Sequence, residues 1–405
     1  MLLPQELVEI ILDELPADDL GSLSSCSMAC RDFAALARPR VFHTIRLMPP
    51  KTAENQTQCQ KFHRLLTFSA HLAPLVKDLR IVDGNDRDYD WNGMKNAGTP
   101  WVIKSSRTLS LVLHVLKLKR LSIEAKPKLE WELMTRSFRA ALRDAAPGLE
   151  VLRLRGIATS AAQELFSMIS QAEGLKSLSI SYQMRRRMIT NLTLAPNWLP
   201  QLRALAFSDH YTSAQFARAL STSQLDFSNL RSLSFSGLDS PAISAFLKAL
   251  PQENVVESLR IWYPISFQAL REHEVLGIPS LPRLKTLRVR APFGLLIFQQ
   301  ILEECTNTDL EEITFEGHAT VLRQAPQFES EQWARFVSAV RQSPVTRVQF
   351  LVSGQIGLES SVQRYRSIVE EALALVGGED AVSVQDLWHR NSAYLSVHIC
   401  GGALD

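Results

Sequence analysis

The chain has 405 residues, of which 46% are hydrophobic and 21% charged, and its formal net charge is +2. This composition supplies ample material for a core, and the near-neutral charge excludes a global attraction to nucleic acid or anionic membranes. No uncharged apolar run reaches the roughly 18 residues that could span a bilayer, and the acidic start lacks the basic region of a secretory signal. Five scattered cysteines are typical of a reducing compartment, so we expect a cytoplasmic or nuclear protein without a membrane or nucleic-acid partner.

The chain begins with an unusually apolar helical segment, "LLPQELVEIILDEL", residues 2–15. Pro4 suits a first helical turn, where its missing N–H costs nothing. Leu7, Ile11 and Leu15 form one stripe at helical spacing, whereas other apolar side chains fall outside it, namely Val8, Ile10 and Leu12. The helix is therefore either buried all round, or buried on one face and offered to a partner on another.

Two further short helices are predicted before residue 42. They cover roughly Asp18–Ser25 and Ser27–Ala37, with Asp18 as a candidate cap. Cys26 and Cys30 stand one helical turn apart, a spacing that favours packing over redox or metal chemistry because no second Cys/His pair completes a zinc site. A unit of about 40 residues is near the lower limit for folding alone, so it must dock onto something else.

An internal repeat occupies most of the remaining chain. The pattern apolar-x-x-apolar-x-apolar begins at Val76, Leu118, Leu149, Leu175, Leu202, Leu230, Val256, Leu284, Leu310 and Val345. The five intervals between Leu175 and Leu310 are all 26–28 residues, and weaker copies begin at Phe42 and Tyr394. Fixed self-similarity at this period is the signature of a repeat architecture.

Each copy predicts a short strand because its inner apolar residues alternate, and helical patterns lie between the copies. These helical segments are expected at 160–174, 212–223, 240–251, 293–305 and 330–344. Stacked strand–helix units share one core, which predicts an α/β solenoid with parallel strands inside a curve and helices outside. The Gly-, Asn- and Asp-rich segment 83–100 reads as a long loop, either a plain excursion or a binding loop.

The first forty residues resemble the F-box. They carry an opening Leu3-Pro4, the acidic and apolar "ELVEIILDEL", the "DDLGSLSSC" stretch of Asp18–Cys26, and a closing element with Cys30, Arg31 and Phe33. The usual tryptophan near that end is absent. The repeats resemble the leucine-rich repeat family, although the Asn or Cys that usually follows each strand is missing. The whole is similar to fungal F-box proteins with leucine-rich repeats, with an F-box at 1–41, a solenoid at 42–400 and a loose tail at 401–405.

This resemblance implies a non-catalytic, substrate-recognition subunit of a Skp–cullin–F-box ubiquitin ligase. The F-box would bind a Skp-type adaptor, and through it a cullin–RING ligase, while the repeats capture a target protein. Carried over by position, the adaptor contacts would be Leu3, Pro4, Leu7, Ile10, Ile11, Leu20 and Leu23. Some of these must instead build the small core, to which Leu15 and Phe33 are assigned. A binding scaffold without ligase activity and an enzyme on a repeat scaffold remain the alternatives.

Basic residues recur at the x positions of the repeats, which are expected to face the inside of the curve. The candidate substrate-binding residues are Arg153, Lys176, Arg203, Arg231, Arg260, Lys285 and Arg288, with Trp262 as an aromatic anchor. Such a surface favours an acidic or phosphorylated ligand, although solvated strands also simply need charge, and Trp262 could equally fill a turn. No catalytic, metal or cofactor motif is present; "HEVLG" at His273 lacks the second histidine of a zinc protease helix.

Overall fold

A computed structural model of the chain describes residues 4–16, 19–50, 57–84, 99–159, 162–184, 201–208, 227–237, 240–251, 253–263, 281–290, 301, 310–318, 338, 345, 347–355, 382–389 and 392–400. The chain divides into two compact units, Met1–Met188 and Ile189–Asp405. The helices expected at 212–223, 293–305 and 330–344, most of the 83–100 loop and the 401–405 tail lie outside the described residues, apart from Ile301 and Ser338.

Three helices open the first unit. They are α1 (Gln5–Asp13), α2 (Leu20–Ala29) and α3 (Arg31–His43). The cap of α2 is Asp19, whose carboxylate accepts the backbone N–H of Ser22 at 3.1 Å, rather than Asp18, which lies outside the described residues. Cys26 lies in α2 whereas Cys30 is the extended residue between α2 and α3, so the expectation that the two cysteines stand one turn apart on a single helix is wrong.

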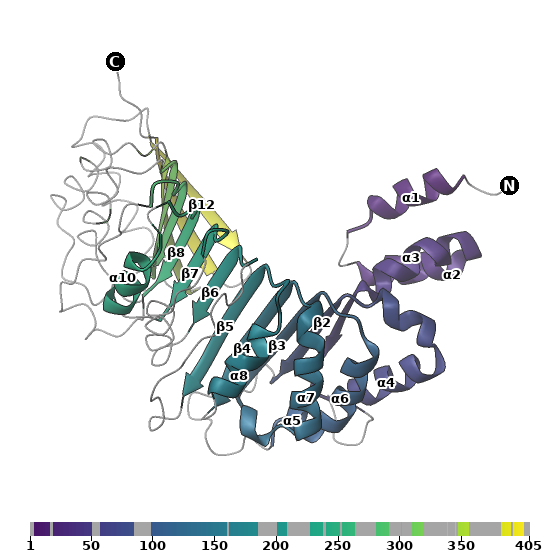
Figure 1. The fold of residues 1–405 in the computed structure, drawn as a ribbon. Coiled ribbons are helices and arrows are strands. Elements are labelled where there is room, and N and C mark those ends of the chain that lie inside the picture. The colour runs from purple at the N-terminus through teal and green to yellow at the C-terminus, as the bar shows by residue number, and fades with distance from the viewer. Residues whose placement is uncertain are drawn as a thin grey trace. The chain divides into compact units, whose positions relative to one another are not determined.

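Five parallel strands follow in the first unit, paired in chain order. They are β1 (Thr44–Leu47), β2 (Asp78–Asp83), β3 (Arg120–Glu130), β4 (Val151–Thr159) and β5 (Ser177–Met184). The helices that connect them are α4 (Gln58–Phe68), α5 (Trp101–Lys104), α6 (Ser106–Val115), α7 (Arg136–Ala145) and α8 (Ala162–Ser170), with short 3-10 turns at Ala70–Leu75, Trp131–Leu133 and Ala146–Gly148. The connecting helices lie on one side of the strands (Figure 1).

The core of the first unit fills the space between these strands and helices. Along β4, Leu152 and Leu154 are buried while Arg153 between them is exposed, and on β2 Leu79 and Ile81 are buried on either side of the exposed Arg80. Phe138 of α7 and Phe166 of α8 are buried among these side chains. The period of two predicted from the repeats is therefore confirmed, and it leaves a second, solvent-facing side on each strand.

A β-bulge interrupts β4 beside its charged residues. The register of β4 against β5 shifts between Arg155 and Ile157, and Gly156 between them has a φ of +71°. A Cβ placed on Gly156 would stand 2.2 Å from the carbonyl oxygen of Ala125 on β3, so only glycine fits here.

The second unit continues the pattern with shorter strands. These are β6 (Ala204–Ser208), β7 (Ser232–Ser236), β8 (Ser258–Trp262), β9 (Thr286–Arg290), β10 (Glu312–His318), β11 (Arg347–Gln355), β12 (Val382–His389) and β13 (Ser392–Cys400). Strands β6 to β11 pair in parallel and in chain order. Strand β13, which contains the weak copy at Tyr394, is antiparallel to both β11 and β12. Treating that copy as a further parallel repeat is therefore wrong, because alternation fixes the faces of a strand and not its direction.

Aromatic side chains build the described core of the second unit. Phe207 of β6 and Phe235 of β7 stack with ring centroids 6.1 Å apart. Phe246 of helix α10 (Ser240–Lys248) meets Phe235 edge to face at 5.4 Å and Phe227 at 5.7 Å. Since α10 covers this side of the strands, the second unit also keeps one strand face toward a helix and the other toward solvent.

Candidate functional site

The three N-terminal helices share a small core of their own. Val8 and Leu12 of α1, Leu23 of α2 and Ala37 of α3 form a buried cluster, with Leu15, Cys26, Phe33, Leu36 and Val41 packed against it. Arg40 of α3 bonds Asp13 of α1 at 2.6 Å and closes one side of this packing. The assignment of Leu15 and Phe33 to the core agrees with this cluster. Of the apolar residues on α1, Val8 and Leu12 are the buried ones, whereas Leu7 and Ile11 are exposed.

The opposite side of α1 is apolar and exposed. Leu7, Ile10 and Ile11 expose 46%, 55% and 42% of their surface, compared with 1% for Val8 and none for Leu12. Because residues three and four apart share a helix face, these three side chains form one contiguous group. We call Leu7, Ile10 and Ile11 the α1 outer face. Of the two alternatives for this helix, the structure therefore shows the second, in which one face is buried within the chain and the other is exposed.

The other predicted adaptor contacts divide between surface and core. Pro4 is exposed, and Leu20 on α2 exposes 50% of its surface. Leu23, by contrast, is 1% exposed within the helical core, so assigning it to an adaptor surface is corrected. Leu3 lies outside the described residues. Met28 was missed: it is 78% exposed at the end of α2, and no periodicity in the sequence marks it because its neighbours are small and polar.

On the solvent side of the first unit's strands, basic residues meet interleaved acids. The carboxylate of Glu150, just before β4, forms ion pairs with Lys119, just before β3, and with Lys176, just before β5. The nitrogen–oxygen distance is 2.8 Å in both pairs. Hydrogen bonds from Lys119 and Lys176 lower the pKa of Glu150 to about 2. Lys176, a predicted ligand contact, is therefore already paired within the chain.

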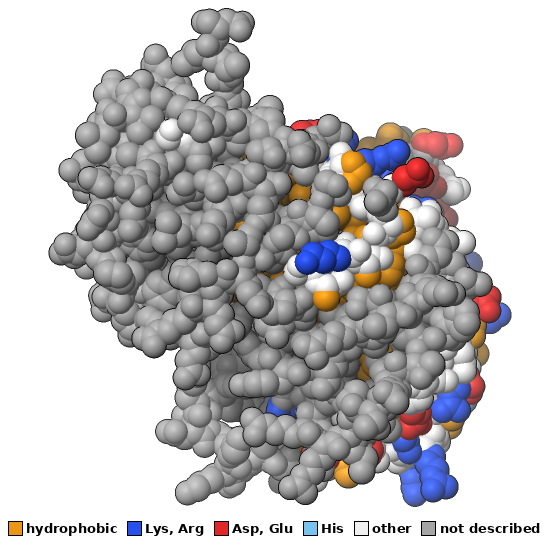
Figure 2. Space-filling model, turned by 60° about the vertical axis from the view of Figure 1, so that its left-hand side comes forward, with side chains coloured by type: hydrophobic (Ala, Val, Ile, Leu, Met, Phe, Trp, Pro, Cys, Tyr) orange, Lys and Arg blue, Asp and Glu red, His pale blue; other side chains and the backbone are white. Residues whose placement is uncertain are grey.

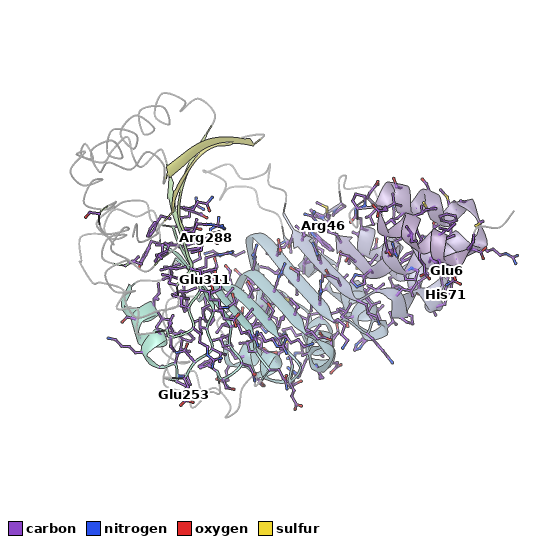
Figure 3. The ribbon with its side chains drawn as sticks, turned by 90° about the horizontal axis from the view of Figure 1, so that it is seen from above. Glu6, Arg46, His71, Glu253, Arg288 and Glu311 are labelled. Atoms are coloured by element: carbon purple, nitrogen blue, oxygen red, sulfur yellow. The ribbon has the colours of Figure 1, made fainter. Side chains whose placement is uncertain are left out.

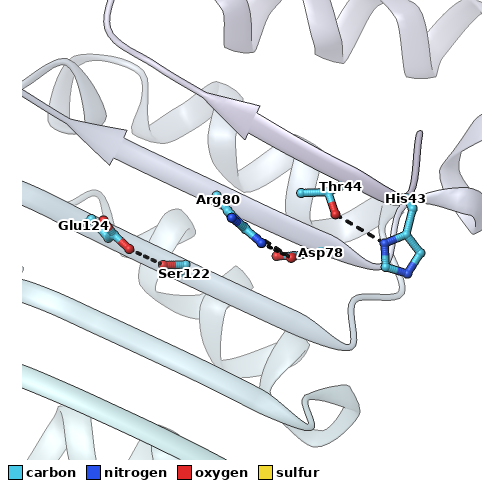
Figure 4. Close-up of polar contacts among 6 residues, drawn as sticks. All are labelled: His43, Thr44, Asp78, Arg80, Ser122 and Glu124. Atoms are coloured by element: carbon cyan, nitrogen blue, oxygen red, sulfur yellow. Dashed lines mark hydrogen bonds and ion pairs between the residues drawn. The ribbon is translucent and has the colours of Figure 1, made fainter. Parts of the chain in front are cut away.

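A second group of polar contacts lies on β1 to β3 (Figure 4). Arg80 bonds the nearly buried Asp78 two residues earlier at 3.0 Å, and Ser122 donates to Glu124 at 3.2 Å. His43 and Thr44 meet at 3.3 Å where α3 passes into β1. Figure 2 shows the same mixture on another face, where basic and acidic side chains of the described residues are interspersed.

In the second unit, the predicted basic residues fall into two groups. Arg231 stands 3.7 Å from Glu257, and Arg288 of β9 forms an ion pair with Glu316 of β10. Figure 3 labels Arg288 and also Glu311, which directly precedes β10. Arg203, Arg260 and Lys285 are exposed, with no ion pair to any described residue. The structure brings Arg260 and Arg288 opposite each other on β8 and β9.

Trp262 ends β8 on the same solvent side. The guanidinium of Arg290, its register partner on β9, lies 5.4 Å from the Trp262 ring centre, a cation–π arrangement. Its indole N–H has no hydrogen-bond partner among the described residues. Trp262 therefore lies in a strand, where its ring contacts Arg290 of the neighbouring strand, and it does not fill a turn.

No other chemistry stands out in the described part of the chain. No group of three or more His, Cys, Asp or Glu residues there could hold a metal ion. None of the helices described is both long and apolar enough to cross a membrane. The surfaces that remain are the α1 outer face, which is apolar, and the solvent side of the strands, which is polar and charged.

The three N-terminal helices thus combine a small buried core with an exposed apolar face on α1. Residues 1–40 match the F-box domain family. F-box domains in general mark substrate-recognition subunits of Skp–cullin–F-box ligases, which bind a Skp-type adaptor and are typically not catalytic themselves. A search of curated proteins found no match for the chain.

Proposed function

We propose that this protein is a substrate-recognition subunit of a Skp–cullin–F-box ubiquitin ligase, in which the α1 outer face binds the Skp adaptor and the repeats bind the target. The observation that carries the proposal is the division of α1 into a buried face, with Val8 and Leu12, and an exposed apolar face within a segment that matches the F-box domain. The protein itself would perform no chemistry. It would hold its target beside the ubiquitin-charged enzyme and so raise the effective concentration of target lysines.

The energetics favour a partner for the α1 outer face. Each apolar side chain that moves from water into an interface contributes about 1–2 kcal/mol at roughly 25 cal/mol per Å². Leu7, Ile10 and Ile11 lie on one helix face at about half exposure, so one partner surface could bury all three together. Leu20 and Met28 of α2 supply further exposed apolar area to the same helical module.

We infer that the strand–helix units are leucine-rich repeats and that their solvent side receives the target. The spacing of 26–28 residues and the parallel, in-order pairing of the strands support this assignment. Of the predicted contacts, Arg153, Arg203, Arg260 and Lys285 have side chains that are exposed and not paired with a described acid. Lys176, Arg231 and Arg288 are paired, so they contribute less free charge than the sequence suggests.

Capture by a purified Skp adaptor, followed by addition of the cullin, tests this function on the full chain. We expect the wild-type chain to bind the adaptor and to bring the cullin with it. The double variant Ile10→Ala with Ile11→Ala should lose most of the capture. Its matched control is Leu111→Ala with Val115→Ala on α6, where both residues are 51% exposed, and this control should bind normally.

Three results would count against the proposal. They are a wild-type chain that does not bind the adaptor, equal capture of the two double variants, and an adaptor complex that never recruits the cullin. The last result would favour the scaffold without ligase activity.

A further inference from the structure

Three arginines on the solvent side of β3 and β4 have no acidic partner within bonding distance among the described residues. Arg120, Arg153 and Arg155 are all exposed, and none forms an ion pair with a residue in the described ranges. This sets them apart from Arg80, Lys119 and Lys176 on neighbouring positions, each of which has a carboxylate. The three guanidinium groups therefore keep their full hydrogen-bonding capacity for a ligand.

Serine hydroxyl groups lie beside these arginines on β5. Ser177, Ser179 and Ser181 occupy every outward position of β5 before the bulge, and Ser177 and Ser179 lie opposite Val151 and Arg153 in the register. Ser122 on β3 stands between Arg80 and Arg153 in the same row. Hydroxyls donate hydrogen bonds to anions without adding charge, so the surroundings suit a negatively charged ligand.

The acids near this group are few and engaged. Glu124 lies opposite Arg155 on β3, where it accepts the hydroxyl of Ser122, and Glu150 is occupied by its two lysines. The bulge at Gly156 comes directly after Arg155 and shifts the register against β5, which resumes with Ile157 opposite Tyr182. Bulges locally increase the twist of a strand and redirect side chains, and they are enriched beside binding sites.

We propose that Arg120, Arg153, Arg155 and the β5 serines form a docking surface for an extended acidic segment of a protein, with carboxylates at alternate positions. This rests on the proposed function, because it names the chemistry of the target that the repeats would receive. The surface formed by Arg120, Arg153, Arg155, Ser177, Ser179 and Ser181 is called the arginine–serine surface.

The spacing of the arginines argues for this ligand. Arg153 and Arg155 are two residues apart on one strand, roughly 6.5–7 Å, which is also the repeat of alternate side chains in an extended peptide. Arg120 lies opposite Val151, on strand β3, and neighbouring strands are about 5 Å apart. It therefore provides a third cation beside the pair formed by Arg153 and Arg155 on β4. Guanidinium groups bind carboxylates through paired N–H donors, so each arginine can hold one acid of the segment.

The same surface lacks what single-stranded nucleic acid requires. None of the outward residues described on β1 to β5 before the bulge is aromatic, so no ring is placed there to stack a base. The net charge of +2 also gives no general attraction to a polyanion. A peptide whose charges match three discrete arginines therefore fits better than an RNA strand.

Fluorescence polarisation with short labelled peptides on the full chain tests the proposal. The probes are a peptide with glutamate at every second position, a peptide of the same composition with the glutamates in one block, and a peptide with glutamine in their place. We expect the alternating peptide to bind about tenfold or more tighter than the glutamine peptide, because hydrogen bonds between guanidinium and carboxylate groups are stronger than those to a neutral amide. The blocked peptide should bind less tightly than the alternating one, and higher salt should weaken both.

The double variant Arg153→Glu with Arg155→Glu should lose this binding by about tenfold or more, whereas Arg107→Glu, an exposed arginine on α6, should leave it unchanged. Because the charge reversals could disturb folding, Arg153→Lys with Arg155→Lys is a second variant, expected to bind weakly but measurably because lysine keeps the charge and loses the paired donors. Thermal unfolding of each variant shows whether the sheet is intact.

The proposal is overturned if the alternating and glutamine peptides bind equally, or if the folded double variant binds as well as wild type. It is also overturned if a phosphoserine peptide or a uridine oligonucleotide of equal charge binds about tenfold tighter than the alternating peptide at the same arginines. Adaptor capture on the same preparations keeps the two hypotheses apart. Arg153→Glu with Arg155→Glu should bind the adaptor normally, and a wild-type chain that binds the peptide without the adaptor would contradict the proposed function alone.

Discussion

Helix α1 and the solvent side of strands β1 to β4 face water with opposite chemistry. Leu7, Ile10 and Ile11 on α1 are apolar and about half exposed, although the helix already contributes Val8 and Leu12 to a core. On the strands, some of the exposed charges meet a partner of the opposite sign, as Lys119 and Lys176 do with Glu150 and Arg80 does with Asp78. The polar surface is thus satisfied in part within the described chain, whereas the apolar face of α1 is left to solvent.

The difference indicates where binding of a partner would gain the most free energy. Apolar side chains that are exposed on a helix gain free energy when another molecule covers them, and for this reason the proposed adaptor site lies on α1. A charge that is paired or solvated gains little from a further partner. Arg120, Arg153 and Arg155 lie together on β3 and β4 and have no ion pair with a described residue, and the further proposal therefore rests on them.

The largest expected effect concerns the geometry of the strand region. Gly156→Ala would place a Cβ 2.2 Å from the Ala125 carbonyl oxygen at a φ of +71°, so the strand must distort. We expect a loss of about 4 kcal/mol or more of unfolding free energy, measured by urea unfolding. Gly174→Ala is the control, because its nearest neighbour stands at an ordinary 3.9 Å. Equal stability of the two variants would show that the bulge is not formed as described.

The next effect separates the two faces of α1. Leu12→Ala removes a fully buried side chain and should cost about 2–5 kcal/mol of unfolding free energy, with the adaptor site lost only as a consequence. Ile10→Ala should change stability by less than about 0.5 kcal/mol and weaken adaptor binding instead. Measuring both properties on both variants tests the division. The comparison fails if Ile10→Ala is the more destabilising of the two.

A moderate effect concerns one charge on the strands that is poorly satisfied. Burial raises the pKa of Asp83, at the end of β2, to about 6, against the opposing effect of backbone N–H groups at Trp101 and Val102. One carboxylate oxygen of Asp83 has no partner among the described residues. The folded state therefore holds this proton more tightly than the unfolded state between pH 6 and the ordinary value of 3.8.

Stability from this group should consequently rise as the pH falls through about 6 and level off near 4, by about 1–2 kcal/mol. The variant Asp83→Asn keeps an acceptor for the two N–H groups and should flatten the profile between pH 4 and 7. Urea unfolding at several pH values measures both chains. A wild-type profile that matches the variant's would mean that Asp83 is ionised without penalty.

The smallest effect concerns the paired charges at Glu150. Because the hydrogen bond from Lys119 is the largest cause of its lowered pKa, Lys119→Ala should raise the pKa of Glu150 more than Lys176→Ala does. Titration of the Glu150 carboxyl by carbon NMR measures this shift in each variant. If neither substitution moves the pKa, the bridge is not populated in solution and the contrast between the two regions weakens.

The repeat was predictable because its physics is local. Alternation of Leu152, Arg153 and Leu154 fixes a strand and its buried face, and a constant interval fixes the stacking of one unit on the next. Direction was less accessible: the copy at Tyr394 alternates like the others, yet its strand runs antiparallel. The bulge was also hidden, because Gly156 looks like any other glycine until Ala125 of the next strand lies beside it.

The sequence predicted the chemical type of each candidate site, but not which individual residues are exposed or unpaired. On α1, two stripes at i, i+4 spacing compete, and only the position of α3 decides that Val8 and Leu12 turn inward. Leu23 looked equivalent to Leu20, but helical packing buries one and exposes the other. On the strands, the sequence shows which residues are basic and not which carboxylate lies within reach across the sheet, as Glu150 does for Lys176.

Amide hydrogen exchange of the full chain, with and without a purified Skp adaptor, tests the central claim most directly. Adaptor binding through the α1 outer face should slow exchange across Gln5–Asp13 and the start of α2, while α6, which also carries exposed apolar side chains, should exchange as before. Unchanged exchange over α1 in the presence of saturating adaptor would contradict the claim that this face is the binding surface.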